Sequence, residues 1–448
     1  MYILQVEVKQ IGWGVKLVNF RKKTIQDIEL AGKRLLIRVD YSVELDEKGE
    51  VADDSKLRAS LPTITQAIDS GASVVLISHM GRPEGRIKPE LSLFPVAKRL
   101  KKLLDHDVEF VPECTGERAE KAITNLQPGQ VVLLENLRFD PREEQNSEEF
   151  ARELAKNVDY FVQDGFAVCY RAHTSVDAIT KVLPSVAGLL VAKEVEALES
   201  VFDPYTKRPL ILIVGGKSVS EKANIIERAI SRADALVLGG PLSTVFLREM
   251  GIKTGKSPVD ENEIHLVRSL LDKAKQARIE RRFMFYVPQD GVVAKMTDKT
   301  ARTRLVDWSA HTVAEIDAYP KRPAYEDSQV QTNEMILDIG PFTGAFIAGL
   351  TQYAGTVVWS GVLGDVEVPS IRGPVGPFSH GSELVIEALT GQFGHSPIRK
   401  LIVGDDTAAF VNQRNMTGVF TLVSTGGGAS NEILSGRSLV GVEALEDR

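Results

Sequence analysis

Charged side chains follow several short apolar runs in the first half of the chain. Arg38 and Asp40 lie in RVDYS, directly after one such run. The other members of this set are His79 and Arg82 in SHMGRP, Arg138 in LENLRF, and Arg171 and His173 in YRAH. Guanidinium groups bind phosphate and carboxylate through paired hydrogen bonds. These residues together indicate a binding site for a small anion.

Glycine gathers at the ends of apolar runs in the second half. Of 36 glycines, 25 lie after residue 200. Three runs end in Gly215-Gly216, Gly239-Gly240 and Gly426-Gly427-Gly428. Glycine lets a ligand approach the backbone and leaves free N–H groups at the start of the next helix. One such pair is typical of an ordinary turn, but three in one region favour a phosphate-binding site.

Alternating apolar runs and helical segments surround both groups of residues. The runs are LLIRVDY, VVLISH, VEFV, VVLLEN and YFVQD, then LILIVGG, ALVLGG, MFYVP, TVVW, LIVGDD and LVSTGGG. This alternation predicts parallel sheets covered by helices. Residues 339–364 carry no formal charge, and their broken pattern indicates a buried helix followed by a buried strand. Ligands bind at the carboxyl edge of such sheets, where the charged residues and glycines would lie.

Composition excludes several classes of protein. The chain has 448 residues, a net charge of −7, 43% hydrophobic residues and two cysteines. These values fit a globular protein and argue against disulfide scaffolds and broad contact with nucleic acid or anionic membrane. Lysines interrupt the apolar stretch of the first twenty residues, so no targeting segment is evident and we expect a cytoplasmic protein.

The order of motifs resembles the phosphoglycerate kinase family from about residue 24 to 445. The matching segments are RVDYS, DDSKLRASLPTI, SHMGRPEG, LSLFPVAKRL, LLENLRF, RAHTS, LPSVAGLL, VGG with Lys222, LDIGP, TVVW, GDDTA, STGGGAS and GVEAL. The resemblance implies an α/β fold of two doubly wound, Rossmann-like parallel-sheet domains, joined by a helix and closing by hinge bending. It also implies a monomeric kinase that acts on a small-molecule substrate.

This resemblance divides the chain. We expect an amino-terminal extension over 1–23 and a substrate domain over 24–190. An interdomain helix over 191–205, whose apolar residues share one face, leads to a nucleotide-binding domain over 206–435. We expect an insertion near 296–333, and a carboxy-terminal segment, 436–448, that returns to the first domain.

The implied reaction is phosphoryl transfer between 1,3-bisphosphoglycerate and ADP, giving 3-phosphoglycerate and ATP with Mg²⁺, as in glycolysis, gluconeogenesis or carbon fixation. Matched position by position, the substrate-binding residues are Asp40, Ser42, Lys56, His79, Arg82, Arg138 and Arg171. Among them Lys56 and Arg171, with Gly427, match catalytic positions. The nucleotide-binding residues are Gly215, Gly216, Ser218, Lys222, Gly239, Gly240, Glu367, Gly404, Asp405, Asp406 and Thr407. Asp406 matches the acid associated with Mg²⁺.

Several functional positions differ from the family pattern. Lys56 replaces an arginine, and Ser42 and Glu44 replace asparagine and proline. In the second half Ser218 stands at a lysine position, directly after Lys217. The remaining differences are Ser360 for asparagine, Val362 for proline, and Val403 and Asp405 for two glycines. Lysine keeps the charge of arginine but loses its planar pair of donors.

These differences leave two alternatives beside a working phosphoglycerate kinase. One is an acyl-phosphate kinase that acts on a different phosphorylated carboxylate. The other is a weakly active or inactive relative with a binding or regulatory role.

Overall fold

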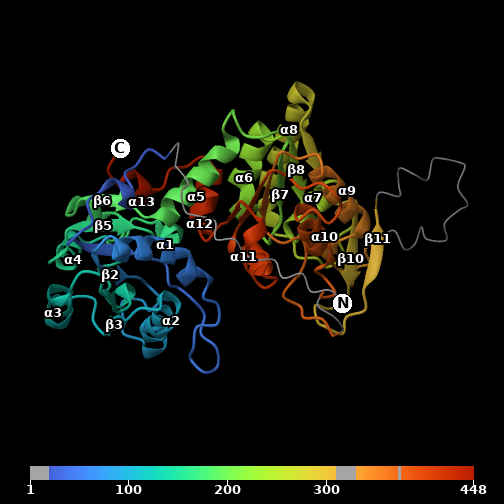
Figure 1. The fold of residues 1–448 in the computed structure, drawn as a ribbon. Coiled ribbons are helices and arrows are strands. Elements are labelled where there is room, and N and C mark those ends of the chain that lie inside the picture. The colour runs from blue at the N-terminus through green and yellow to red at the C-terminus, as the bar shows by residue number, and fades with distance from the viewer. Residues whose placement is uncertain (1–19, 309–328, 372–374) are drawn as a thin grey trace, which may run out of the picture.

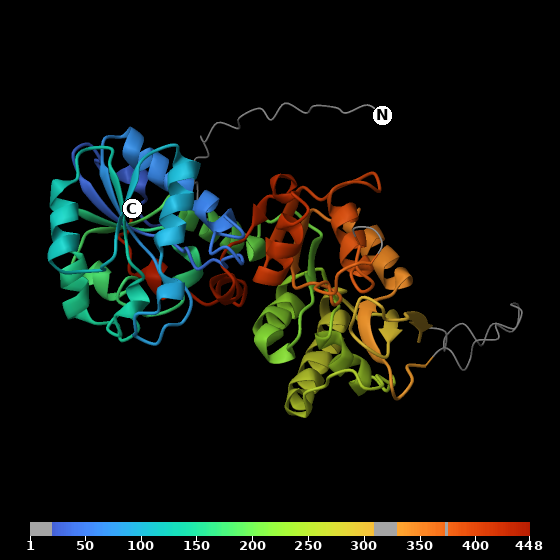
Figure 2. The ribbon, with the colours of Figure 1, turned by 90° about the horizontal axis from the view of Figure 1, so that it is seen from below.

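The computed structural model describes residues 20–308, 329–371 and 375–448. Two α/β lobes lie side by side, and the chain passes from one to the other through helix α5 (Leu189–Glu199) (Figures 1 and 2). Each lobe is built on a six-stranded sheet. Strands that are buried along their whole length read as continuous apolar runs, because helices cover both faces of a parallel sheet.

The first lobe contains a sheet in the order β3-β4-β2-β1-β5-β6, with every pair parallel. Its strands are β1 (Arg34–Arg38), β2 (Ser73–Ile77), β3 (Val108–Val111), β4 (Val131–Leu134), β5 (Tyr160–Gln163) and β6 (Ser185–Ala187). Its helices are α1 (Ser55–Asp69), α2 (Phe94–Leu104), α3 (Glu117–Asn125) and α4 (Glu148–Leu154). The doubly wound parallel fold predicted for this half is confirmed.

The second lobe repeats the plan with the order β15-β14-β13-β7-β8-β9, again parallel throughout. Its strands are β7 (Leu210–Val214), β8 (Ala235–Leu238), β9 (Met284–Tyr286), β13 (Thr356–Ser360), β14 (Arg399–Val403) and β15 (Leu422–Val423). Its helices are α6 (Val219–Arg232), α7 (Leu242–Glu249), α8 (Ile264–Arg281), α9 (Pro341–Thr351), α10 (His380–Leu389), α11 (Asp405–Asn412) and α12 (Gly428–Leu434). Helix α9 and strand β13 confirm the helix and strand predicted within 339–364.

A small antiparallel sheet, which the sequence interpretation missed, extends the second lobe. It has the order β11-β10-β12, formed by β10 (Asp290–Ala294), β11 (Arg304–Asp307) and β12 (Met335–Ile339). The short link from β10 to β11 suits antiparallel pairing, because a parallel pair needs a crossover of a dozen or more residues. Strand β11 lies inside the predicted insertion, of which residues 309–328 lie outside the described part of the chain.

Helix α5 (Leu189–Glu199), followed by the short helix η6 (Ser200–Phe202), connects the lobes. At its start the Leu190 amide donates to Asp164 Oδ1 at 2.9 Å, which attaches the helix to the end of β5. Further along, Glu194 Oε1 accepts hydrogen bonds from the Thr425 amide at 2.8 Å and its hydroxyl at 3.0 Å. The helix is therefore bonded to both lobes.

The carboxy-terminal residues lie against the first lobe, and the C-terminus is labelled there in Figures 1 and 2. After α13 (Val440–Glu443), the Glu446 amide donates to Ser185 O at 3.0 Å. Glu446 O in turn accepts from the Lys23 amide at 2.8 Å. The last residues thus join β6 to the first described residues of the chain; residues 1–19 lie outside the described part.

Candidate functional site

Charged residues of the first lobe meet at the carboxyl ends of its central strands. Asp40 follows β1, His79 follows β2, and Arg138 lies four residues beyond β4. These three strands are neighbours and run parallel, so their ends share one edge of the sheet. The register explains why residues nearly 100 positions apart in sequence contribute to one site.

Lys56 joins this edge from the first turn of α1. Its ammonium lies 2.9 Å from Asp40 Oδ2 and donates to the Ser42 carbonyl at 3.0 Å. Burial raises the pKa of Asp40, but nearby cations, Lys56 first among them, outweigh it and hold this pKa below its ordinary value. Asp40 therefore stays ionised beside the lysine.

Arg38 contacts the His79 ring. The sequence interpretation counted Arg38 among the charged residues of the anion site but did not include it among the matched substrate-binding residues. Arg38 is fully buried, with Nη2 3.1 Å from His79 Nδ1 and Nε donating to the Ser175 hydroxyl at 2.9 Å. Burial, reinforced by Arg38, lowers the pKa of His79 well below its usual value. The ring is therefore neutral, and the arginine fixes its orientation. In the sequence, the signal for this role was the presence of an arginine within an otherwise apolar strand.

The three remaining arginines of the set differ in exposure. Arg138 is 5% exposed, and its Nη1 donates to the Gly81 carbonyl at 2.8 Å. Arg171 is half-buried, with its guanidinium over the Tyr170 ring, whereas Arg82 is exposed in the loop after β2. Burial and the nearby Arg138 lower the pKa of His173 to about 4. The surroundings are thus cationic, as an anion site requires.

In the second lobe, Lys222 and Thr407 lie near the ends of β7, β13 and β14. The Lys222 ammonium donates to the Ser360 hydroxyl at 3.0 Å, and burial lowers its pKa. Thr407 Oγ1 accepts from the Gly361 amide at 2.7 Å, so its hydroxyl hydrogen remains able to donate. Gly404, with a φ of +95°, lies between these two side chains.

The glycine pairs have a different structural reason from the one inferred from sequence. Their amides all donate within the protein, to the carbonyls of Ser360, Val362, Val214 and Leu363. A methyl group on Gly240 would lie 2.8 Å from the Val362 carbonyl oxygen. Gly215 and Gly240 therefore allow strand ends to pack backbone against backbone, whereas Gly239 packs against the Leu363 side chain and Gly216 adopts a φ of +109°. The amides of these four glycines are therefore already engaged within the protein.

Ser218 and Lys217 do not combine to replace a phosphate-binding lysine. The Ser218 hydroxyl caps α6 and donates to Glu263 Oε1 at 2.8 Å. Lys217 is exposed, with its ammonium 3.8 Å from Glu367 Oε1. Glu263 also accepts from the Ser220 amide, so the start of α6 already holds a carboxylate. Lys222, which is half-buried, thus remains the candidate for that role.

Asp405 and Asp406 open α11 beside the glycine loop 426–428. Gly427 has a φ of +43°, and a methyl group there would lie 2.9 Å from Asp405 Oδ2. Burial raises the pKa of Asp405, and the strongest opposing influence is Lys56 of the other lobe. Tyr170 of the first lobe also lies against this loop, since a methyl group on Gly428 would be 2.9 Å from its Cζ, so the two groups of candidate residues face each other between the lobes.

The acidic residues fit a Mg²⁺ ion that is bound mainly through a ligand. Within the described ranges, no three or more His, Cys, Asp and Glu side chains gather into a metal cage. Mg²⁺ commonly uses one or two carboxylates together with substrate phosphates and water. Asp406, exposed at the start of α11, provides such a carboxylate.

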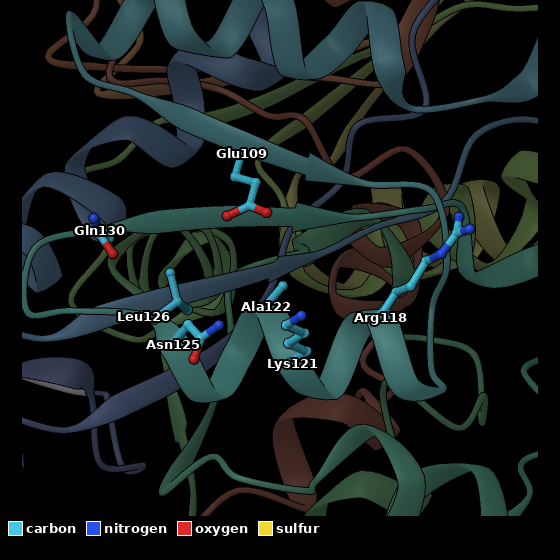
Figure 3. A pocket seen from close by; sticks show the side chains of 7 residues that line it. All are labelled: Glu109, Arg118, Lys121, Ala122, Asn125, Leu126 and Gln130. Carbon is cyan, nitrogen blue, oxygen red and sulfur yellow. The ribbon is translucent and has the colours of Figure 1, made fainter.

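One groove at the surface lies away from these residues (Figure 3). About 340 Å³ in volume, it runs between α3 and the edge strand β3. Its lining includes Glu109, Arg118 and Lys121, all exposed. None of the predicted site residues lines it. None of the described helices is long and apolar enough to cross a membrane.

Comparison with known proteins identifies close sequence relatives. The family model for phosphoglycerate kinase matches residues 25–437. The phosphoglycerate kinase of Moorella thermoacetica is 39% identical over 428 residues, covering 95% of this chain and 100% of the relative. That of Desulforapulum autotrophicum is 39% identical over 426 residues, with coverage of 95% and 100%.

Solved structures agree with the sequence matches. Phosphoglycerate kinase from Coxiella burnetii superposes with a TM-score of 0.77 at 30% identity, covering 94% of this chain and 98% of that one. The Pyrococcus horikoshii enzyme gives 0.75 at 27% identity, with the same coverage. These matches favour phosphoglycerate kinase activity over the two alternatives. The chain belongs to the phosphoglycerate kinase family.

Proposed function

We propose that the protein transfers a phosphoryl group reversibly between 1,3-bisphosphoglycerate and ADP, forming 3-phosphoglycerate and ATP. The observation that carries this proposal is the apposition of two unlike sites. Tyr170, next to Arg171 in the first lobe, lies against the glycine loop of the second, because a methyl group on Gly428 would be 2.9 Å from its Cζ. A phosphorylated acid on one side and a nucleotide on the other would meet at this point.

The first lobe supplies the binding groups for the phosphorylated acid. Arg138 and Arg171 suit the phosphate that is not transferred, together with His79 and Arg82. The Asp40 carboxylate suits a hydroxyl donor, and the Ser42 hydroxyl, which accepts from the Gly81 amide at 3.3 Å, can donate to the substrate. The site thus matches a small acid with one phosphate and one hydroxyl group.

The second lobe supplies the groups for the nucleotide. Lys222 and Thr407 would donate to its phosphates, and Glu367 would accept from its ribose. Gly216 and Gly240, which are half-buried, would leave room for the nucleotide, while Gly404 and Gly427 would do so close to the phosphates. Ser218 supports this region by capping α6.

Asp406 would hold Mg²⁺, with Asp405 beside it. A bound Mg²⁺ supplies charge neutralisation between the phosphates of the nucleotide. Phosphoryl transfer otherwise requires positioning and electrostatic stabilisation, with little covalent work for the protein.

Lys56, Arg171 and Gly427 are the proposed catalytic groups. The Lys56 ammonium and the Gly427 amide would donate to oxygens of the transferring phosphoryl group, where negative charge is stabilised. Arg171 would hold the acid in line with the nucleotide. We also propose that the protein acts as a cytoplasmic monomer in glycolysis, gluconeogenesis or carbon fixation.

A coupled assay with ATP, Mg²⁺ and 3-phosphoglycerate tests the proposed reaction. We expect turnover in the wild-type protein and its loss in Arg171→Ala. Other phosphorylated carboxylates, assayed at the same concentration, should react more slowly. A folded wild-type protein without turnover, or one that prefers a different acid, contradicts the proposal.

A further inference from the structure

The segment after β5 passes from the anion-binding site to the second lobe. Phe166 and Cys169 belong to one apolar cluster with residues of α5, α6 and α12, and Tyr170 packs against that cluster. The Cys169 carbonyl accepts from the Gly441 amide at 2.8 Å. Arg171 follows immediately, so one short segment touches both halves of the molecule.

Tyr170 contacts the glycine loop of the second lobe. A methyl group on Gly428 would lie 2.9 Å from Tyr170 Cζ and 3.2 Å from its hydroxyl oxygen. Gly428 follows Gly427, whose amide we assign to the transferring phosphoryl group. The ring therefore rests against the backbone of this loop, and any side chain at position 428 would displace it.

The same ring supports the guanidinium of Arg171. Arg171 Cζ lies 4.9 Å from the centre of the Tyr170 ring, within the range of a cation–π interaction. Stacking on an aromatic face restricts a side chain that otherwise has many rotamers. A displacement of the ring would therefore alter the orientation of the arginine.

We propose that Tyr170 is a positioning residue that couples the glycine loop of one lobe to the anion-binding arginine of the other. This inference rests on the proposed function. Binding of nucleotide next to loop 426–428 would fix the Tyr170 ring, which in turn would hold Arg171 in the orientation that binds 3-phosphoglycerate. By reciprocity, each ligand would then strengthen the binding of the other.

A simpler role would be that Tyr170 only fills space at the interface. That role predicts lower thermal stability after substitution, with unchanged coupling between the ligands. Coupling is therefore the quantity that separates the two roles.

The experiment measures 3-phosphoglycerate affinity by calorimetry with and without Mg-ADP. The variants are Tyr170→Phe, which keeps the ring, and Tyr170→Leu and Tyr170→Met, which remove it. We expect Phe to retain the wild-type ratio of affinities and the other two to reduce it by roughly fivefold, within the usual range of such couplings. Tyr205→Leu, at a tyrosine that is 92% exposed, is the matched control and should leave the ratio unchanged.

Kinetics and melting temperature complete the test. The KM for 3-phosphoglycerate should be higher in Tyr170→Leu than in the wild-type protein. In Tyr170→Phe it should equal the wild-type value. If either ringless variant melts as a folded protein and keeps the wild-type ratio and KM, the inference is wrong. An inactive wild-type protein would instead contradict the proposed function, so the two failures are distinguishable.

Discussion

The Lys56 ammonium lies 2.9 Å from the Asp40 carboxylate, while it also donates to the Ser42 carbonyl. The lysine is therefore already engaged within its own lobe. Because an ammonium has three donors, one of them remains for a transferring phosphoryl group. An arginine has five donors in a rigid fork and could keep one contact while making another.

Loss of the Lys56 charge should slow the proposed reaction strongly. Lys56→Met is expected to lower kcat by about 10²–10³-fold, the usual cost of removing one donor to the transition state. Lys56→Arg should match or exceed the wild-type rate. Steady-state kinetics with ATP and 3-phosphoglycerate measures both.

Arg58 provides the matched control on the same helix. It pairs with Asp54, with Nε 2.7 Å from Oδ1, and is exposed. Arg58→Met should therefore leave kcat within about twofold, as expected of a surface ion pair. A large decrease in Lys56→Arg would show that the site has adapted to lysine, contrary to this prediction.

Asp405 should weaken nucleotide binding. A carboxylate beside the phosphates repels them by about 1 kcal/mol at 4 Å, even at the dielectric constant of water. Asp405→Asn is therefore expected to lower the KM for ATP by roughly fivefold. The measurement is KM at saturating Mg²⁺ and 3-phosphoglycerate. If kcat falls together with a higher KM, Asp405 contributes a favourable contact instead.

Glu194, buried between α5 and Thr425, should make stability depend on pH. Burial raises its pKa to about 7, above the value near 4.3 that it has when unfolded. A group with a raised pKa stabilises the fold below its unfolded pKa, and this contribution is lost as pH rises through the folded one. We expect a loss of about 3 kcal/mol between about pH 4.5 and 7 from this residue.

Glu194→Gln removes that titration while it keeps an oxygen that can accept from Thr425. Urea unfolding at several pH values should show a smaller loss of stability toward neutral pH in the variant. Asp164, whose pKa burial also raises to about 7, remains in both proteins and contributes equally. Parallel pH profiles for the two proteins would contradict the assignment.

Ser218 should contribute to stability through its hydroxyl. Ser218→Ala removes the cap of α6 and a hydrogen bond to Glu263, which together should lower the free energy of unfolding by about 1 kcal/mol. Ser218→Thr retains the hydroxyl and should cost less. Chemical denaturation of the three proteins provides the comparison, and equal stabilities of Ala and wild type would refute the capping role.

Local patterns were sufficient to predict both parallel sheets. Continuous apolar runs such as LILIV form strands buried along their whole length, and the residues that follow them lie at the carboxyl edge. For the same reason Asp40 and His79 could be assigned to one site before their distance was known. Parallel register then brings together residues that are far apart in sequence.

Tertiary contacts decided the features that sequence reasoning missed. Ser218 is bonded to Glu263, 45 residues away, and no spacing in the sequence announces that pair. Arg38 lies in an apolar strand, and only the fold shows that it reaches His79 and Ser175. Strand β10 likewise pairs with β11, and only the fold shows that this part of the predicted insertion lies beside it.

The attachment of the last residues to the first lobe also governs the order in which the protein can be completed during synthesis. Glu446 bonds to Ser185 and Lys23, so the first lobe lacks these partners until residue 446 has left the ribosome. The second lobe has all its strands before that point. We therefore expect the first lobe, although it is synthesised before the second, to complete its folding after the second.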